Sequence, residues 1–165
     1  MLRGRVLDVG CGTGEHALMA ARLGLEAVGI DTAPSAIAIA KGKAQARGVA
    51  ARFLVWNALF LTALGEEFDT VLDCGLFHVF SDEERPPFVQ NLAAVIRTGG
   101  RYFMLCFSER QPGDWGPRRV TQAEIRASFK DGWVIDSIEP AILEITIGPG
   151  VLAWLAAFTR TGSHG

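Results

Sequence analysis

A glycine-rich turn beside a carboxylate is the first stretch of this sequence that could do chemistry. The apolar run 6–9 carries one acid, Asp8, and ends in three alternate glycines, Gly10, Gly12 and Gly14. Helical spacing of apolar residues follows at once, so the stretch predicts a parallel strand, a tight turn and a helix over 15–25. Backbone N–H groups and a helix N-terminus converge at such a turn, and glycines let the backbone approach a ligand closely. We therefore expect a ligand-binding site here.

A second acid at a strand end narrows the choice of ligand. The apolar run 27–30 ends in Asp31, where a carboxylate can accept hydrogen bonds from both hydroxyls of a ribose. The turn reads G-x-G-x-G rather than the dinucleotide fingerprint G-x-G-x-x-G, and Glu15 places a negative charge where a pyrophosphate would bind. Asp8 suits a cationic group such as an ammonium. A ligand with a ribose, a positive charge and no phosphate matches S-adenosylmethionine, and a sheet turn without a ligand is the competing interpretation.

Residues 5–31 resemble motif I and the following acidic strand end of the class I S-adenosylmethionine-dependent methyltransferases. The resemblance implies an enzyme that binds S-adenosyl-L-methionine and releases S-adenosyl-L-homocysteine. Asn57 stands where that family usually has an acid facing the adenine amino group; its amide oxygen can accept the same hydrogen bond, or the residue only forms a turn. His16 either contacts the donor carboxylate or has no role in binding. The donor-binding residues implied are Asp8, Gly10, Cys11, Gly12, Thr13, Gly14, His16, Asp31, Thr32, Asn57, Ala58, Asp73, Cys74 and Gly75.

Length and composition limit the class of function. The 165 residues predict a single domain over 1–165. A net charge of −2 gives no general attraction to nucleic acid or to anionic membranes, and no apolar run is long enough to span a bilayer. Cys11, Cys74 and Cys106 lack metal-type spacing and the three histidines are far apart, so we expect reduced thiols and no metal site. These features predict a cytoplasmic protein whose partner is a small-molecule acceptor, without a nucleic-acid or membrane partner.

The remaining elements alternate between apolar strands and helices. Helices are expected over 35–47, from Pro86 to a break at 98–100, and from a capping box at Thr121 and Glu124 to about Phe129. The last two strands should form an antiparallel edge pair joined through the turn 148–150, and 161–165 a frayed tail. The fold class expected is α/β: a doubly wound, Rossmann-like sheet, mostly parallel, with about five helices. Its seven strands are expected at 6–9, 27–30, 51–56, 68–73, 101–107, 133–140 and 151–161.

Two loops at strand ends are candidates for the acceptor site. In open parallel sheets ligands bind beyond the carboxyl ends of the strands, which places the loop 74–80 beside the donor. His78 in that loop is the candidate general base, although a lone histidine among apolar residues is more often a packing residue. The irregular segment 108–119 is long enough to be functional. The acceptor-binding residues expected are Phe77, His78, Trp115 and Arg118, with packed or solvated side chains as the alternative.

Residues 68–130 resemble more closely the thiopurine and thiol/halide methyltransferases and bacterial relatives that act on small heterocyclic or phenolic acceptors. The similarity lies in the run 68–77, in Gly116-Pro117-Arg118 and in the capped segment 120–125. It implies methyl transfer to a thiol, a halide-like anion or a heterocycle. An O-methyltransferase of a quinone or phenol, or a catalytically weak donor-binding module, is the alternative.

The chain departs from that family before motif I. Class I small-molecule methyltransferases usually carry a helical lid there, and this sequence begins at Met1, so the N-terminal lid helix is expected to be missing. Acceptor selection is the property that this affects most. A homodimer in which a second copy covers the donor cleft is one way to replace the lid.

Overall fold

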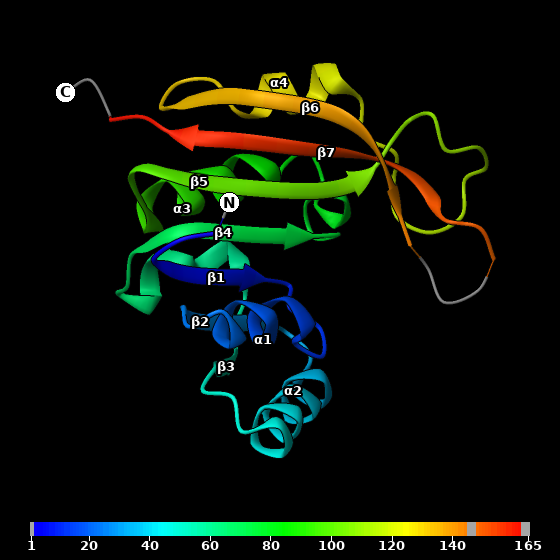
Figure 1. Cartoon of the computed structure of the whole chain (residues 1–165). Helices are drawn as coiled ribbons and strands as arrows, with labels where there is room; N and C mark the ends of the chain where they lie inside the picture. The colour runs from blue at the N-terminus through cyan, green and yellow to red at the C-terminus, as the bar shows by residue number, and fades with distance from the viewer. Residues whose placement is uncertain (1, 145–147, 163–165) are drawn as a thin grey trace.

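The protein is built on one seven-stranded sheet with strand order β3-β2-β1-β4-β5-β7-β6 (Figure 1). The computed structural model describes residues 2–144 and 148–162. The first five strands pair in parallel, whereas β7 pairs antiparallel with both β5 and β6 at one edge. The predicted fold class is therefore confirmed. The strands are β1 (Arg5–Val9), β2 (Glu26–Asp31), β3 (Arg52–Val55), β4 (Phe68–Cys74), β5 (Ile96–Phe107), β6 (Trp133–Leu143) and β7 (Val151–Arg160).

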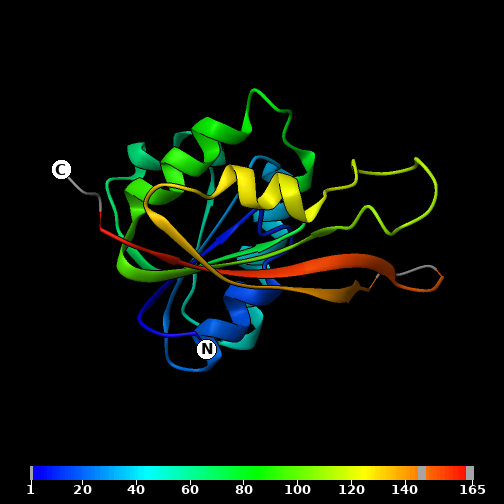
Figure 2. The same ribbon diagram turned by 90° about the horizontal axis from the view of Figure 1, so that it is seen from above.

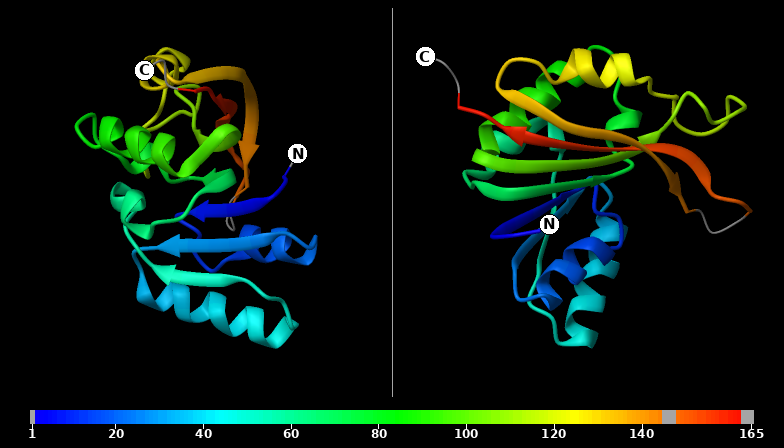
Figure 3. Two further views of the ribbon diagram at one scale, coloured as in Figure 1. Left: turned by 90° about the vertical axis from the view of Figure 1, so that its left-hand side faces the viewer. Right: turned by 45° about the horizontal axis from the view of Figure 1, so that its top comes forward.

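Helices cover both faces of the sheet. One apolar cluster packs the first two helices against β1, β2 and β3, and a larger cluster packs the other helices on the opposite face. Figure 3 shows these two layers on either side of the strands. The doubly wound arrangement follows because each strand, apolar on both faces, needs cover on both. The helices are α1 (Glu15–Arg22), α2 (Pro34–Arg47), α3 (Arg85–Val95) and α4 (Gln122–Ser128), with the short 3-10 helices η1 (Ala58–Leu64) and η2 (Phe77–Val79).

The structure corrects two predicted boundaries. A break was expected at 98–100, but α3 passes directly into β5 at Ile96, and those residues belong to the strand. Pairing between β4 and β5 begins at Phe68 with Ile96 and resumes at Thr70 with Arg101, so the intervening residues of β5 bulge outward. The first helix ends at Arg22 rather than at Leu25, because Gly24 adopts a positive φ of 84° and ends it.

Part of one sheet face carries no helix among the described residues. Figure 1 looks onto this face of β5 and β7, with α3 and α4 behind the strands. Seen from above in Figure 2, the green and yellow helices α3 and α4 lie together on one side of the red strand β7. The opposite side of β5 and β7 is therefore left bare beside α1.

Candidate functional site

The carboxyl ends of β1, β2 and β4 bring three acids to one edge of the sheet. β1 lies between the other two strands, and Val9 is paired with Ile30 on one side and with Asp73 on the other. Asp8, Asp31 and Asp73 therefore meet around the glycine turn, as the parallel topology predicts. A cavity of about 250 Å³ opens there. It is lined by Asp8, Gly10, Cys11, Gly12, Thr13, Gly14, Glu15, His16 and Cys74.

The glycine turn has the backbone shape that only glycine adopts easily. Gly12 has a φ of 56°, and a Cβ at that position would have nothing within 4 Å, so the backbone faces open space. Gly14 has a φ of 92°, and its Cβ would lie 2.7 Å from the ring of Phe53. A side chain at Gly14 would therefore clash where α1 packs against β3, and one at Gly12 would be strained and would occupy the ligand space.

Asp8 is a buried carboxyl group without a full set of partners. Its side chain is 2% exposed, and Oδ2 has no hydrogen-bond partner. Burial, and then the nearby Asp73 carboxyl, raise the pKa of Asp8 to about 8, against a hydrogen bond from the Ala17 backbone that lowers it. An unsatisfied buried acceptor is costly. A cationic ligand group in the cavity would remove that cost, so the ammonium of the predicted donor fits this turn.

Asp31 braces the glycine turn from the neighbouring strand. Its Oδ2 accepts a hydrogen bond from the Gly12 backbone N–H at 2.9 Å, and its Oδ1 accepts one from the Ala33 N–H at 2.9 Å. Each carboxylate oxygen has a second lone pair, so both can still accept from ribose hydroxyls. Thr32 lies between the two anchored residues and is exposed.

Asn57 lies beside Asp31 but has a structural partner of its own. The Trp56 N–H donates to the Asp31 carbonyl at 3.0 Å, which brings the ends of β2 and β3 together. The Asn57 side chain caps η1, since its Oδ1 accepts from the Leu59 N–H at 2.9 Å. The turn-forming role is thus present, and the second lone pair of the same oxygen stays available to an adenine amino group. Ala58 is buried directly after it.

Asp73 has a partner that the sequence did not reveal. Its Oδ2 accepts a hydrogen bond from the Tyr102 hydroxyl at 2.5 Å, and its Oδ1 accepts from the Leu76 N–H at 2.7 Å. Burial raises the pKa of Asp73 to about 7, although these hydrogen bonds oppose the shift. Tyr102 is the one tyrosine of the chain and comes from the middle of β5. Its rarity is the only signal that could have marked it.

Glu15 is neutralised by the second helix. Hydrogen bonds from Arg47 and then from Lys43 lower the pKa of Glu15 to about 2. The Lys43 ammonium also donates to the Thr13 hydroxyl at 2.9 Å, which ties the turn to α2. Thr13 and Glu15 therefore contribute to the shape of the turn, and His16 lies at its rim.

His78 is held by the backbone on both sides of its ring. Nδ1 accepts a hydrogen bond from the Phe107 N–H at 2.9 Å, and the other ring nitrogen faces the Gly75 backbone. The side chain is 4% exposed, and burial lowers the pKa of His78 to about 4. A ring without a free lone pair and with so low a pKa is poorly suited to accept a proton near neutral pH. The geometry favours the packing role over that of a general base.

The other residues expected at the acceptor site lie apart from one another. Phe77, expected to contact the acceptor, is fully buried and its ring packs against Phe129, because η2 turns it into the core. Trp115 is 50% exposed on the loop after β5, edge-on to the Phe107 ring. That loop is organised by Arg119, whose guanidinium donates to the carbonyls of Gln111, Pro112, Trp115 and Pro117.

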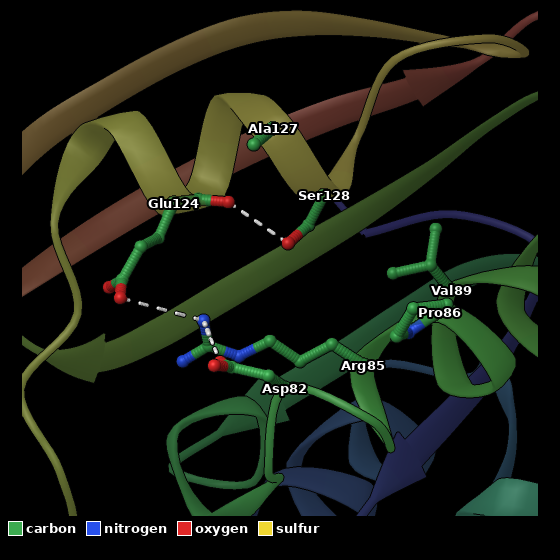
Figure 4. Close-up of a pocket in the computed structure, with 7 residues that line it drawn as sticks. All are labelled: Asp82, Arg85, Pro86, Val89, Glu124, Ala127 and Ser128. Carbon is green, nitrogen blue, oxygen red and sulfur yellow. Dashed lines mark hydrogen bonds and ion pairs between the residues drawn. The ribbon is translucent and has the colours of Figure 1, made fainter.

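A second cavity, of about 430 Å³, lies between α3 and α4 (Figure 4). Arg85 reaches into this region, with Nη1 3.9 Å from Asp82 and 3.9 Å from Glu124, and its guanidinium stacks over the Phe77 ring. Arg118, expected to bind the acceptor, instead pairs with Asp82 at 2.8 Å. This cavity shares no lining residue with the glycine turn.

The described residues hold neither a cluster of metal-ligating side chains nor a helix that could span a membrane. No group of three or more His, Cys, Asp or Glu side chains in 2–144 and 148–162 is placed to hold a metal ion. Within the same part of the chain, every helix is too short or too polar to cross a membrane.

Comparisons with known proteins agree with the geometry of the glycine turn. Residues 6–100 match the family model described as "Methyltransferase domain". The 2-heptyl-1-hydroxyquinolin-4(1H)-one methyltransferase of Mycobacteroides abscessus is 37% identical over 145 residues, which are 86% of this chain and 64% of that protein. The demethylmenaquinone methyltransferase of Thermus thermophilus is 40% identical over 114 residues, 68% of this chain and 51% of that protein. The chain thus spans between half and two thirds of these relatives.

Solved structures extend the likeness to the whole fold. A structure described as "Conversion of a Disulfide Bond into a Thioacetal Group during Echinomycin Biosynthesis" is 36% identical, with a TM-score of 0.86 over 97% of this chain and 77% of that chain. A magnesium protoporphyrin IX methyltransferase from Synechocystis with bound S-adenosylmethionine shares the fold, with 22% identity and a TM-score of 0.74 over 94% of this chain and 69% of that chain. The finer resemblance to thiopurine and thiol/halide methyltransferases stays a prediction. The chain belongs to the class I S-adenosylmethionine-dependent methyltransferases.

Proposed function

We propose that this chain transfers the methyl group of S-adenosylmethionine to a small aromatic acceptor. The observation that carries the proposal is the unpaired, buried Oδ2 of Asp8 at the mouth of the glycine turn. A carboxyl group in that position is costly by itself and favourable beside an ammonium. The family match over residues 6–100 supports the same donor.

Each residue around the turn would bind a different group of the donor. Asp8 would pair with the donor ammonium, and the two oxygens of Asp31 would accept from the ribose hydroxyls. Asn57 would accept from the adenine amino group with the lone pair that Leu59 leaves free. When bound, the donor supplies an electrophilic methyl group on a sulfonium. The main task of the protein is then to fix the alignment of donor and acceptor.

The groups near the turn favour an acceptor that ionises without help. His78 offers no free lone pair, and Asp73 has both oxygens engaged by Tyr102 and Leu76. An acidic hydroxyl on a heterocycle, or a thiol, loses its proton near neutral pH without a strong base. The Mycobacteroides relative is named for a hydroxyquinolone, and we propose a hydroxylated nitrogen heterocycle of this kind as the acceptor.

A sulfur acceptor is the second candidate. It is supported by the 36% identity to the chain from the thioacetal-forming system, and it agrees with the thiol/halide resemblance predicted from residues 68–130. A quinol acceptor, as the name of the Thermus relative indicates for that protein, stays as the third.

The test is a methyl-transfer assay with a panel of acceptors. Purified protein is incubated with S-adenosylmethionine and, separately, with 1-hydroxyquinolin-4(1H)-one, a catechol and a small aryl thiol, and methylated products are measured by mass spectrometry. We expect the hydroxyquinolone to be methylated fastest. Preference for the thiol would replace the heterocycle by the second candidate. Micromolar binding of S-adenosylhomocysteine without turnover on any acceptor would overturn the enzymatic proposal in favour of a donor-binding module.

A further inference from the structure

Tyr102 lies in the core, away from the glycine turn, yet a continuous path of contacts joins it to that turn. Its side chain is fully buried, and it does not line the cavity at the turn. Tyr102 is directly paired with Val71, and Asp73 lies two positions further along β4, on the same face of the sheet. An aromatic side chain reaches such a diagonal neighbour. The register of β4 and β5 therefore brings Tyr102 to Asp73.

Aromatic neighbours fix the ring of Tyr102 on several sides. It stacks on Phe129 with ring centroids 5.5 Å apart and on Phe158 with centroids 5.4 Å apart. Phe88 and Trp133 meet it edge-on. A ring held in this way gives its hydroxyl one position. Burial raises the pKa of Tyr102 well above its ordinary value, so the hydroxyl keeps its proton and acts as a donor.

Asp73 carries this position to the loop that follows β4. One carboxyl oxygen, Oδ2, accepts from the Tyr102 hydroxyl at 2.5 Å, and the other, Oδ1, accepts from the Leu76 N–H at 2.7 Å. The Asp73 side chain is 2% exposed, so water does not compete for these two hydrogen bonds. Because the carboxyl group is planar and rigid, a hydrogen bond at one oxygen also sets the direction of the other. The place of Leu76 is therefore tied to that of Tyr102.

Leu76 lies directly on the first glycine of the donor turn. A Cβ at Gly10 would be 3.2 Å from both Cβ and Cδ1 of Leu76, so this side chain covers the glycine closely. Gly10 has a φ of 66° and lines the cavity at the turn. Asp73 does not line that cavity, so its influence on a bound donor passes through Leu76.

We propose that Tyr102 is a positioning residue for the donor: through Asp73 it holds Leu76 against Gly10 and so keeps the glycine turn in its binding shape. The inference rests on the proposed function for the donor site at the turn, and it requires no particular acceptor. A structural role alone would lower the stability of a Tyr102 variant and leave its donor affinity unchanged. Positioning lowers the affinity as well, because only molecules with a correctly shaped turn bind.

The experiment compares two variants by calorimetric titration with S-adenosylhomocysteine at pH 8, well below their unfolding temperatures. Tyr102→Phe keeps the packed ring and removes only the hydroxyl. Its donor Kd should rise about tenfold, as when the competent turn falls to about one tenth of the molecules. Ile125→Val is the matched control, because Ile125 is fully buried in the same core cluster and the loss of a methyl group lowers stability without touching Asp73. Its donor Kd should stay within about twofold of the wild type.

Two variants of Asp73 test the middle of the path. In Asp73→Asn the amide oxygen can still accept from the Leu76 N–H, and the amide NH2 group can donate to the Tyr102 hydroxyl oxygen. The donor Kd of this conservative variant should therefore stay within about threefold of the wild type. Asp73→Ala removes both contacts and should weaken donor binding at least as much as Tyr102→Phe. If Asp73→Asn binds as weakly as Asp73→Ala, the charge of Asp73 matters rather than its position, and the inference is wrong.

Steady-state kinetics separate positioning from a general loss of structure. In the methyl-transfer assay, Tyr102→Phe should raise the KM for S-adenosylmethionine about tenfold and leave the acceptor KM and the kcat at saturating donor unchanged. A loss of structure around the turn would instead lower kcat and raise both KM values.

The outcomes also separate this inference from the proposed function. A Tyr102→Phe protein that is less stable but binds the donor like the wild type would overturn the inference, and so would equal weakening in Ile125→Val. Donor binding that depends on Tyr102 without turnover on any acceptor would support the inference and overturn the proposed reaction. If the wild type binds no S-adenosylhomocysteine, the donor site at the turn and this inference fail together.

Discussion

Donor binding should strengthen as the pH rises from about 6 to about 8, because Asp8 has to lose a proton before it can pair with the donor ammonium. Burial raises the pKa of Asp8 to about 8 in the ligand-free protein. At a pH near 6, about one molecule in a hundred then carries the ionised carboxylate. Binding releases close to one proton in this range, so the affinity should increase about tenfold per pH unit and level off above about 8.

The same carboxyl group should make the free protein less stable at high pH. The pKa of Asp8 is higher in the folded chain than in the unfolded chain, where it is near its ordinary value of 3.8. Its unfavourable contribution is therefore absent below a pH of about 4 and grows as the pH rises toward about 8. Asp8→Asn keeps the shape and cannot ionise. Without donor, this variant should unfold at a higher temperature than the wild type at pH 8.

The assay is calorimetric titration with S-adenosylhomocysteine at several pH values, in two buffers of different ionisation enthalpy, which counts the protons released. Asp8→Asn should bind more weakly at pH 8 and show no slope from this group. A wild-type Kd that stays constant between pH 6 and 8, with no proton release, would refute the reasoning. If the Kd of Asp8→Asn still depends on pH, the group that loses the proton is Asp73 rather than Asp8.

Three further predictions concern other parts of the site. Asp31→Ala should weaken donor binding by about 1–3 kcal/mol, because it removes the charged acceptor for the ribose hydroxyls. Asp131→Ala, at an exposed turn, is the control and should leave the donor Kd unchanged, as measured by calorimetric titration. Tyr102→Phe should lower the free energy of unfolding by about 1–3 kcal/mol, since it leaves a buried oxygen of Asp73 unpaired, and a urea melt unchanged from wild type would contradict that bond. Arg119→Ala should speed proteolytic cleavage within 108–119 and leave the donor Kd unchanged; equal cleavage rates would show that another contact holds the loop.

The part of the site that the sequence predicted is the part made by neighbours along the chain. The glycine turn follows β1 directly, and parallel topology alone brings Asp8 and Asp31 to the same edge. The period of the apolar residues and the spacing between the acids are enough to place these strands and the turn. The edge pair β6 and β7 was predicted for the same reason, since each strand shows its own apolar pattern.

Contacts between distant segments were beyond a spacing argument. The partner of Asp73 comes from the middle of β5, and the group that orients His78 is the backbone N–H of Phe107 at the far end of that strand. Phe77 looked like a loop residue, but η2 rotates it into the core. Each outcome depends on side-chain packing across strands, which the order of residues does not record.

The way in which the loop after β5 is held has a consequence for how its sequence can evolve. Its path is held in large part by Arg119, whose guanidinium donates to four backbone carbonyls and also lies over the rings of Trp115 and Phe107. Pro112 contributes only its carbonyl to this set of hydrogen bonds, an atom that every residue type carries, so an exchange at that position keeps the hydrogen bond. A lineage that keeps this arginine could vary such loop positions in single mutational steps, while the glycine turn and the sheet beneath it stay the same.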